Sequence, residues 1–308
     1  MCAGSPRSWT GGPDPIGDLA LSGPMTAHGD TDRTAADGSD EGAVDPSAVD
    51  LVRADGTAGA LWQAWTTGER LAALPELLRP RTLTEGFAAQ RRLSERAGAS
   101  YGWKLAATAT AGQAHIGVDA PLPGMLFERF RHAPGDVVPS GDLHMAVAEA
   151  EFAFVLRSAV DAGASRDELR AAVGAVHCAV ELPESRFDDF VAAGAPSLLA
   201  DAACAGRFVL GPEIPGGAAL DLAATPTTLR VDDETATGSG ASVLGDPWTA
   251  LAWLADTLPE HGVRLEAGAL VTTGTTTVPV AVHPGATVRA SFGDGGALGI
   301  VEFTLAAA

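Results

Sequence analysis

Two glutamates separated by one residue, Glu149 and Glu151, lie inside an apolar, β-prone run that extends from Met145 to Leu156. In an extended strand, residues i and i+2 point to the same face, so these carboxylates are expected to project side by side. Two carboxylates close together in apolar surroundings repel each other and resist desolvation. A hard divalent cation removes that conflict, and Mg²⁺ is typically held by carboxylates, water and substrate oxygens. The spacing therefore indicates a metal-binding strand, although an edge strand whose glutamates face water would show the same pattern.

Other polar residues in apolar settings could complete such a site. Lys104 is the only lysine of the chain and has apolar flanks. A buried lysine needs a counter-charge, which suits proton transfer or the anchoring of a carboxylate, whereas a solvent-facing lysine would need no explanation. Glu181 ends a further apolar run and could add a third carboxylate. The threonine-rich segment 272–277 could bind an oxyanion, or could simply be β-structure.

Composition limits the classes of partner and compartment. The chain has 308 residues and a formal net charge of -19, which disfavours nucleic acid and anionic membranes as partners. Its three cysteines are too few and too scattered for a disulfide framework, and burial as inert thiols is expected for Cys178 and Cys204. No apolar run approaches the ~20 residues of a membrane span, and no secretory signal is recognisable. A cytoplasmic location is therefore expected.

Three regions follow from the pattern along the chain. Residues 1–48 are rich in Gly, Pro, Ser, Thr and Asp and are predicted to form a disordered acidic tail, with translation starting at Met1 or at Met25. Residues 49–100 are predicted to form a small helical subdomain, with helical periodicity from about Val49 to Gly98. Within it, Thr82 and Glu85 have the spacing of a capping box. Residues 101–308 are predicted to form a mixed-β catalytic domain.

Short β-prone segments dominate this third region and alternate with Gly/Pro turns. The expected strands are Gly102–Ala107, Ala146–Leu156, His177–Leu182, Gly206–Leu210, Leu229–Val231, Leu270–Thr273, Val288–Phe292 and Leu298–Leu305. The expected helices are Arg166–Val176 and Trp248–His261, and the segment from Gly293 to Gly296 is expected to be a hairpin turn. Many strands and few helices predict an α+β chain with a mixed β-barrel or roll, not a doubly wound sheet.

Seven short segments, taken in their order along the chain, resemble motifs of the 2-keto-4-pentenoate hydratase / 4-oxalocrotonate decarboxylase family, within the fumarylacetoacetate hydrolase superfamily. The resemblance covers about Asp55 to the C-terminus. The segments that carry it are Gly102–Ala106, Ile116–Phe127, Glu149–Leu156, Glu181–Arg186, Asp201–Gly206, Gly245–Leu254 and Val278–Gly285.

The resemblance implies a barrel-like fold of the fumarylacetoacetate hydrolase C-terminal type, preceded by the small helical subdomain. It implies that Mg²⁺ or Mn²⁺ is held by Glu149, Glu151 and Glu181. It also implies a 2-hydroxy-2,4-dienoate or 2-oxo-enoate substrate, with Lys104 as proton donor or carboxylate anchor. Further substrate contacts are expected from Leu122, Arg186 and Thr276, and family members usually assemble as homo-oligomers.

The chain also departs from the family pattern. Leu122 stands where the hydratases carry an acidic residue, which is closer to the decarboxylase pattern, and alanines and Cys204 replace polar residues in the segment from Ala202 to Ala205. We expect a hydratase, with a decarboxylase as the alternative and the exact substrate open. An acylpyruvate C–C hydrolase is a further alternative. Such an enzyme needs a base to activate water, commonly a His–Glu pair, and no histidine of this chain has an obvious place for that role. A non-catalytic scaffold subunit would have no reason to retain the three glutamates and Lys104.

Overall fold

The computed structural model describes residues 50–308, so the expected disordered segment 1–48 lies outside the described residues. Within residues 50–308 none of the helices combines the length and apolar character that a membrane crossing requires. The helices are α1 (Leu51–Thr67), α2 (Leu83–Ala97), α3 (Thr110–Ile116), α4 (Arg166–Ala172), α5 (Phe190–Ala193), α6 (Ala195–Ala200) and α7 (Pro247–Thr257). The strands are β1 (Ser100–Ala106), β2 (Leu122–Phe127), β3 (Arg131–His132), β4 (Val137–Val138), β5 (Val147–Leu156), β6 (Val173–Leu182), β7 (Arg207–Glu213), β8 (Pro226–Val231), β9 (Glu234–Ser239), β10 (Leu270–Thr272), β11 (Val280–Ala281), β12 (Thr287–Phe292) and β13 (Gly299–Leu305).

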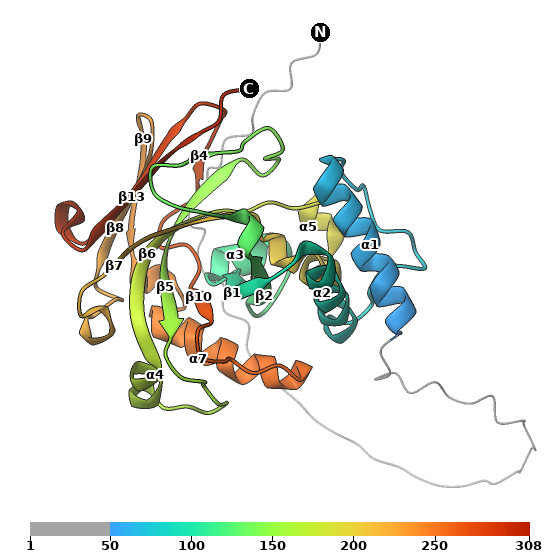
Figure 1. Ribbon diagram of the computed structural model, residues 1–308, viewed down its shortest axis with the longest axis horizontal. Helices are drawn as coiled ribbons and strands as arrows, with labels where there is room; N and C mark the ends of the chain where they lie inside the picture. The colour runs from blue at the N-terminus through green and yellow to red at the C-terminus, as the bar shows by residue number, and fades with distance from the viewer. Residues whose placement is uncertain (1–49) are drawn as a thin grey trace, which may run out of the picture. The chain divides into compact units, whose positions relative to one another are not determined.

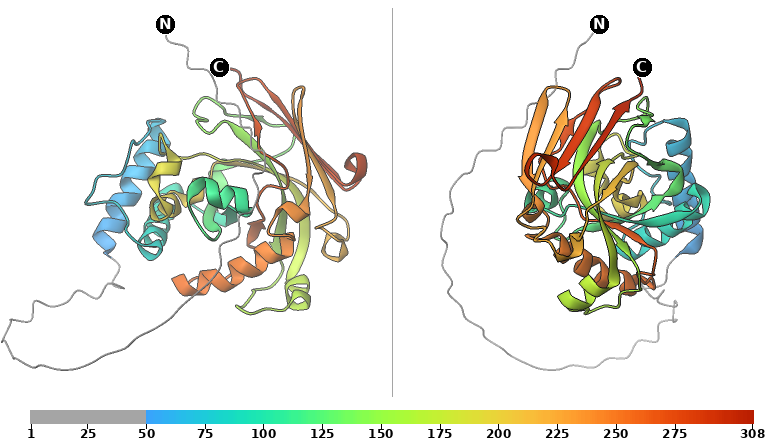
Figure 2. Two further views of the ribbon diagram at one scale, coloured as in Figure 1. Left: turned by 180° about the vertical axis from the view of Figure 1, so that it is seen from behind. Right: turned by 60° about the vertical axis from the view of Figure 1, so that its left-hand side comes forward.

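Two mixed sheets make up most of this region (Figure 1). The larger sheet has eight strands in the order β2-β1-β10-β5-β6-β7-β3, with β11 also paired to β5. The second sheet has five strands in the order β4-β13-β12-β8-β9. Both views of Figure 2 show the orange and red strands of the second sheet lying against the long yellow-green strands β5 and β6. The expected mixed-β fold is therefore confirmed.

Alternation along β5 explains how this strand serves both a core and a site. Phe152 and Phe154 share one face: the ring of Phe152 meets that of Phe292 on β12 edge-on at 5.2 Å, and Phe154 packs against Trp248 of α7. Both phenylalanines are fully buried, and burial of a large apolar side chain contributes about 1.5–3 kcal/mol. The odd-numbered positions Glu149 and Glu151 necessarily point to the other face.

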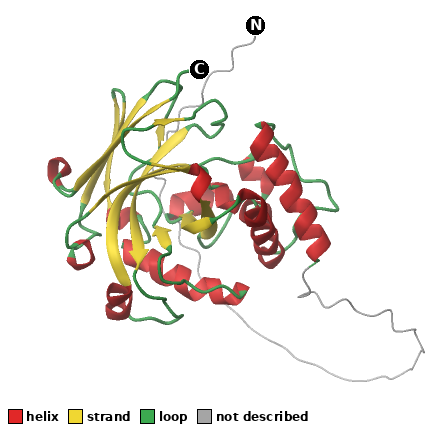
Figure 3. Ribbon diagram, viewed as in Figure 1, coloured by secondary structure: helices red, strands yellow, loops and turns green. Residues whose placement is uncertain are grey.

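Helices α1 and α2 lie together on the side of β1 and β2 that is away from the second sheet, as Figure 3 shows by its grouping of red helices. Helix α2 packs directly on α6. The two helices are so close that a Cβ at Gly86 would lie 2.3 Å from the carbonyl oxygen of Pro196, so only glycine fits there. Thr82 is the N-cap of α2 and accepts a hydrogen bond from the Glu85 N–H. The return bond of a capping box goes one residue further back, because the Glu85 carboxylate accepts from the Arg81 N–H.

Two sequence expectations about helices were wrong. The helix expected over Arg166–Val176 ends at Ala172, and Val173–Val176 already belongs to β6, where Val176 pairs with Phe154. A β-branched residue and a glycine follow Ala172, and pairing with β5 outweighs helix propensity there. The helical pattern expected to continue as far as Pro80 ends at Thr67, because Gly68 ends α1 in the left-handed conformation, whereas the second helix expected from Thr82 is present as α2. The turn expected at Gly293–Gly296 does connect β12 to β13.

Candidate active site

Three carboxylates meet on one face of the larger sheet. Glu149 on β5 pairs directly with Glu181 on β6, and Glu151 lies two residues further along β5 on the same face. One oxygen from each of Glu149, Glu151 and Glu181 lies within 4.8 Å of the other two. The antiparallel register of β5 and β6 therefore brings together the three glutamates that the sequence singles out.

Burial makes this group of charges costly. Glu151 and Glu181 are buried and Glu149 is half-buried. Burial, opposed by Lys104 and reinforced by Glu181, raises the pKa of Glu149 to about 7. Burial and the charges of Glu181 and Glu149 raise the pKa of Glu151 well above its usual range, and burial also raises the pKa of Glu181. Without a cation, the three groups resist being ionised together.

Lys104 supplies one compensating charge. Its Nζ lies 3.3 Å from Oε1 of Glu181 and donates a hydrogen bond of 3.1 Å to the carbonyl oxygen of Ala203. Burial lowers the pKa of Lys104, but the charges of Glu181 and Glu149 outweigh burial and leave that pKa above its usual value. The side chain is only 2% exposed, so this lysine is a charged group held inside the protein.

Three carboxylate oxygens of this group lack hydrogen-bond donors within the described part of the chain. Oε1 of Glu151 and both carboxylate oxygens of Glu181 are buried and have no hydrogen-bond donor among residues 50–308. The contact between Glu181 and Lys104 is thus an ion pair without the alignment of a hydrogen bond. Buried oxygens of this kind cost free energy unless they are paired, and hard divalent ions such as Mg²⁺ and Mn²⁺ take oxygen ligands. The donor set therefore fits such an ion.

The threonine-rich turn after β10 holds the carboxylate strand in place. The Gly274 N–H donates a 3.0 Å hydrogen bond to Oε2 of Glu151. Both the N–H and the hydroxyl of Thr276 donate to the carbonyl oxygen of Ala150, each at 2.8 Å. Thr276 is fully buried, and its hydroxyl is bonded to the β5 backbone between the two glutamates of that strand.

A run of three residues in the left-handed conformation lies beside Lys104. Ala202, Ala203 and Cys204 have φ values of 51°, 49° and 61°. Non-glycine residues rarely adopt this conformation, and each costs of order 1–3 kcal/mol of strain. The turn directs the carbonyl oxygen of Ala203 to Lys104. Sequence reasoning missed this turn, since it contains no glycine or asparagine that would mark it.

Leu122 faces the same side of the sheet as Lys104. Within the β1–β2 pair, Lys104 is opposite Gly124 and Ala106 is opposite Leu122, so these four positions share one face. Leu122 belongs to a small apolar cluster with Leu198, Ala203 and Cys204, which we call the Leu122 cluster. Cys204 is a free buried thiol whose pKa burial raises to about 12, as burial also does for Cys178, so both thiols are inert as expected.

Arg186 lies in a buried network of its own. Its guanidinium forms an ion pair with Asp201 and donates to the carbonyl oxygens of Ala205 and Asp201, at 2.9 and 2.7 Å. It also stacks on the ring of Trp65, with 3.8 Å between the guanidinium carbon and the ring centroid. These contacts engage one face of the guanidinium and its N–H edges with protein groups. The structure thus brings together Lys104 and the three glutamates but places the Arg186 guanidinium against Asp201 and Trp65.

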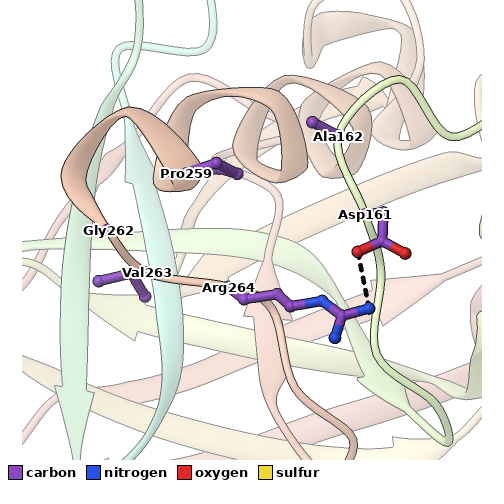
Figure 4. Close-up of a pocket in the computed structure, with 6 residues that line it drawn as sticks. All are labelled: Asp161, Ala162, Pro259, Gly262, Val263 and Arg264. Atoms are coloured by element: carbon purple, nitrogen blue, oxygen red, sulfur yellow. Dashed lines mark ion pairs between the residues drawn. The ribbon is translucent and has the colours of Figure 1, made fainter.

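The surface depression in Figure 4 lies elsewhere. It has a volume of about 510 Å³ and is lined by residues 161–162 and by residues around Pro259 to Arg264, with an exposed ion pair between Arg264 and Asp161. Residue 161 follows the C-terminal end of β5, whereas Glu149 and Glu151 lie toward its start. The depression therefore contributes nothing to the carboxylate site.

Comparison with known proteins agrees with this geometry. Residues 104–306 match the family model of the fumarylacetoacetate (FAA) hydrolase C-terminal domain. The chain is 34% identical to 2-keto-4-pentenoate hydratase of Paraburkholderia xenovorans (strain LB400) over 237 residues, which cover 74% of this chain and 87% of that protein. It is 33% identical to 4-oxalocrotonate decarboxylase of Pseudomonas sp. (strain CF600) over 198 residues, which cover 64% of this chain and 75% of that protein.

A solved structure gives the same answer. The 4-oxalocrotonate decarboxylase from Pseudomonas putida G7, complexed with magnesium and adipate, superposes with a TM-score of 0.76 at 27% sequence identity. The match covers 84% of this chain and 99% of that one. The chain therefore belongs to the fumarylacetoacetate hydrolase family, in the group that includes the 2-keto-4-pentenoate hydratases and the 4-oxalocrotonate decarboxylases.

Proposed function

We propose that the protein is a divalent-metal-dependent lyase that acts on 2-hydroxy-2,4-dienoate or 2-oxo-enoate acids, as a hydratase that yields a 4-hydroxy-2-oxo acid. The observation that carries the proposal is the set of buried oxygens on Glu151 and Glu181 that have no hydrogen-bond donor among residues 50–308, next to the charged Lys104. Relatives named 2-keto-4-pentenoate hydratase and a relative crystallised with magnesium support it.

Each residue has a distinct task in this proposal. Glu149, Glu151 and Glu181 hold Mg²⁺ or Mn²⁺, which when bound polarises the 2-oxo acid and stabilises negative charge on its enol oxygen. Thr276 holds the backbone of Ala150 and so keeps the two β5 carboxylates in place. Leu122 contacts the substrate on the Lys104 side of the sheet. Arg186 holds Asp201, the residue before the left-handed turn, and we propose this role for it in place of the substrate contact that the resemblance implies.

The reaction needs one proton transfer to carbon and one addition of water. The 2-hydroxy-2,4-dienoate gains a proton at C5 and its 2-hydroxyl loses one, which gives an α,β-unsaturated 2-oxo acid. Water then adds across the C3–C4 double bond, with oxygen at C4 and a proton at C3. Lys104 is the charged donor in this site and can hold or deliver a proton, or anchor the substrate carboxylate.

Decarboxylation of a 4-oxalocrotonate-like acid is the second candidate, and the Leu122 cluster favours it. Leu122 is buried among apolar side chains on the face that carries Lys104. An apolar surrounding destabilises a carboxylate relative to neutral CO₂, which assists its departure. Lys104 would then return a proton to the carbon that has lost CO₂.

A product analysis tests both candidates. Purified protein with Mg²⁺, or with EDTA, is mixed with 2-hydroxypenta-2,4-dienoate and separately with 4-oxalocrotonate, and ultraviolet absorbance and product mass are followed. Metal-dependent gain of one water supports the hydratase, and metal-dependent loss of CO₂ supports the decarboxylase. Turnover that survives complete chelation, or no turnover of either acid, contradicts the proposal.

Assembly and location are part of the same proposal. Family members commonly form homo-oligomers, and we propose that this chain does so in the cytoplasm, where free thiols such as Cys178 and Cys204 stay reduced. Light scattering of the purified chain measures the oligomeric state directly, and a monomer would contradict the proposal.

A further inference from the structure

Gln90 of α2 is a fully buried amide whose polar atoms all have partners. The side chain is 0% exposed. Its Nε2 donates to the carbonyl oxygens of Pro123 and Leu199, at 3.0 and 2.6 Å, and its Oε1 accepts from the Met125 N–H at 2.8 Å. A single side chain of the helical segment therefore ties strand β2 to helix α6.

On β2, the two bonded residues stand on either side of Gly124. Gly124 is the residue opposite Lys104 in the β1–β2 pair. The backbones approach closely there: a Cβ at Gly124 would lie 3.1 Å from Cδ of Lys104 and 2.0 Å from the carbonyl oxygen of Ala202. The bonds to Pro123 and Met125 thus fix the piece of backbone on which the aliphatic stem of Lys104 rests.

On α6, the bonded residue precedes the left-handed turn. Leu199 is followed within three residues by Ala202, and the carbonyl oxygen of Ala203 accepts the hydrogen bond from Nζ of Lys104. The close packing of Gly86 against Pro196 places α2 on α6 one helical turn before Gln90. Gln90 therefore bonds β2 on both sides of the residue at the Lys104 stem, and it bonds α6 shortly before the turn that meets the Lys104 head.

We infer that Gln90 is a positioning residue that sets the place of the Lys104 ammonium in the site. The inference rests on the proposed function insofar as Lys104 acts in turnover. A buried glutamine that only satisfies local backbone groups would affect stability without moving Lys104. The two roles differ in what happens at Lys104, and Lys104 can be observed by itself because it is the only lysine.

The test uses the full chain with lysine labelled by ¹³C at Cε and ¹⁵N at Nζ, so that one side-chain signal reports Lys104. Gln90→Glu keeps the shape and the acceptor for Met125 but removes both donated bonds, and Gln90→Met removes all three. Leu61→Ala is the matched control, because it removes buried apolar packing from α1 and no hydrogen bond. Folding, Mg²⁺ affinity, kcat and KM are measured for each.

We expect both Gln90 variants to shift the Lys104 signal and to lower kcat by about 10- to 100-fold, the loss that a small misplacement of a reacting group causes. Mg²⁺ should still bind, because all three glutamates are retained, with an affinity that changes only as far as Lys104 moves relative to Glu181. Leu61→Ala should leave the Lys104 signal in place. An unmoved Lys104 signal in folded Gln90→Glu overturns the inference, as does a kcat equal to that of Leu61→Ala. If the wild type turns over neither acid, the proposed function fails, yet the Lys104 signal still decides the role of Gln90.

Discussion

Glu149 and Glu181 face each other directly across β5 and β6, so that two carboxylates occupy one cross-strand pair. Like charges directly opposite each other destabilise an antiparallel sheet, and burial raises the pKa of both groups. Glu151 adds a third negative charge to this pair, and Lys104 offsets one of the three. The arrangement is unfavourable by itself and becomes favourable when a divalent cation is added, which is the physical basis of the predictions on metal binding.

Replacing Glu149 by glutamine should weaken Mg²⁺ binding at least about tenfold and abolish turnover while the fold is retained. The neutral amide fills the same space but offers a weaker ligand. Titration calorimetry with Mg²⁺ measures the affinity, and circular dichroism checks the fold. Glu302→Gln, which removes an exposed carboxylate of β13 on the second sheet, is the control and should bind Mg²⁺ like the wild type.

Stability should depend on pH in opposite ways with and without the cation. The pKa of Glu149 rises from an ordinary value of 4.5 to about 7 on folding, so the folded metal-free protein binds more protons than the unfolded chain between these values. Stability of the metal-free protein should therefore fall as pH rises from about 5 to 8, by an amount on the order of 2 kcal/mol. With saturating Mg²⁺ the trend should reverse, because protonation competes with metal binding.

Thermal melts in EDTA and in Mg²⁺ at several pH values measure both trends. The difference in melting temperature between the two conditions should widen with increasing pH. The Glu149→Gln variant should lose much of the pH dependence of the EDTA series. A metal-free protein whose melting temperature rises steadily from pH 5 to 8 would show that the carboxylates are ionised at little cost.

Lys104→Met should lower kcat by about 10²- to 10⁴-fold, the usual contribution of a general acid. Mg²⁺ should still bind, and more tightly, because the variant removes the positive charge beside Glu181. Lys104→Arg separates the two roles proposed for this residue. Arginine keeps the charge but holds its proton too tightly to donate it. If Lys104 only anchors a carboxylate, the arginine variant keeps much of kcat with a raised KM; if Lys104 donates a proton, both variants lose kcat equally. Wild-type kcat in Lys104→Met would remove this residue from the mechanism.

Period-2 reasoning was sufficient to predict that Glu149 and Glu151 share a face, and the apolar flanks of Lys104 correctly predicted its burial. Cross-strand register, by contrast, is set by the packing of Phe152 and its neighbours, so the sequence alone could only suggest that Glu181 joins the pair. Nothing local in the sequence marks the left-handed turn at Ala203, because it is maintained by tertiary contacts. Gln90 could not be found either, since a buried amide is recognisable only through the backbone groups that it meets.

Gly274→Ala should both destabilise the protein and weaken metal binding. Gly274 has φ of +94°, and a Cβ there would lie 1.9 Å from Oγ1 of Thr108, so the turn must move and carry away the N–H that Oε2 of Glu151 accepts from. The matched control is Gly285→Ala, where φ is +83° but no heavy atom lies within 4 Å of the added Cβ. The control should cost only the backbone strain of about 1–3 kcal/mol and should keep wild-type Mg²⁺ affinity. Equal Mg²⁺ affinity in both variants would contradict the prediction and show that the turn does not influence metal binding.

Arg186→Met should destabilise the fold by about 3–5 kcal/mol, because it leaves the buried carboxylate of Asp201 without its cationic partner. Chemical denaturation measures this loss. In the fraction that stays folded, KM should remain near the wild-type value, because the guanidinium is engaged by Asp201, Ala205 and Trp65. The double variant Arg186→Met with Asp201→Leu removes both charges and should recover part of the stability. A large rise in KM without loss of stability would instead assign Arg186 to the substrate, as the family resemblance first suggested.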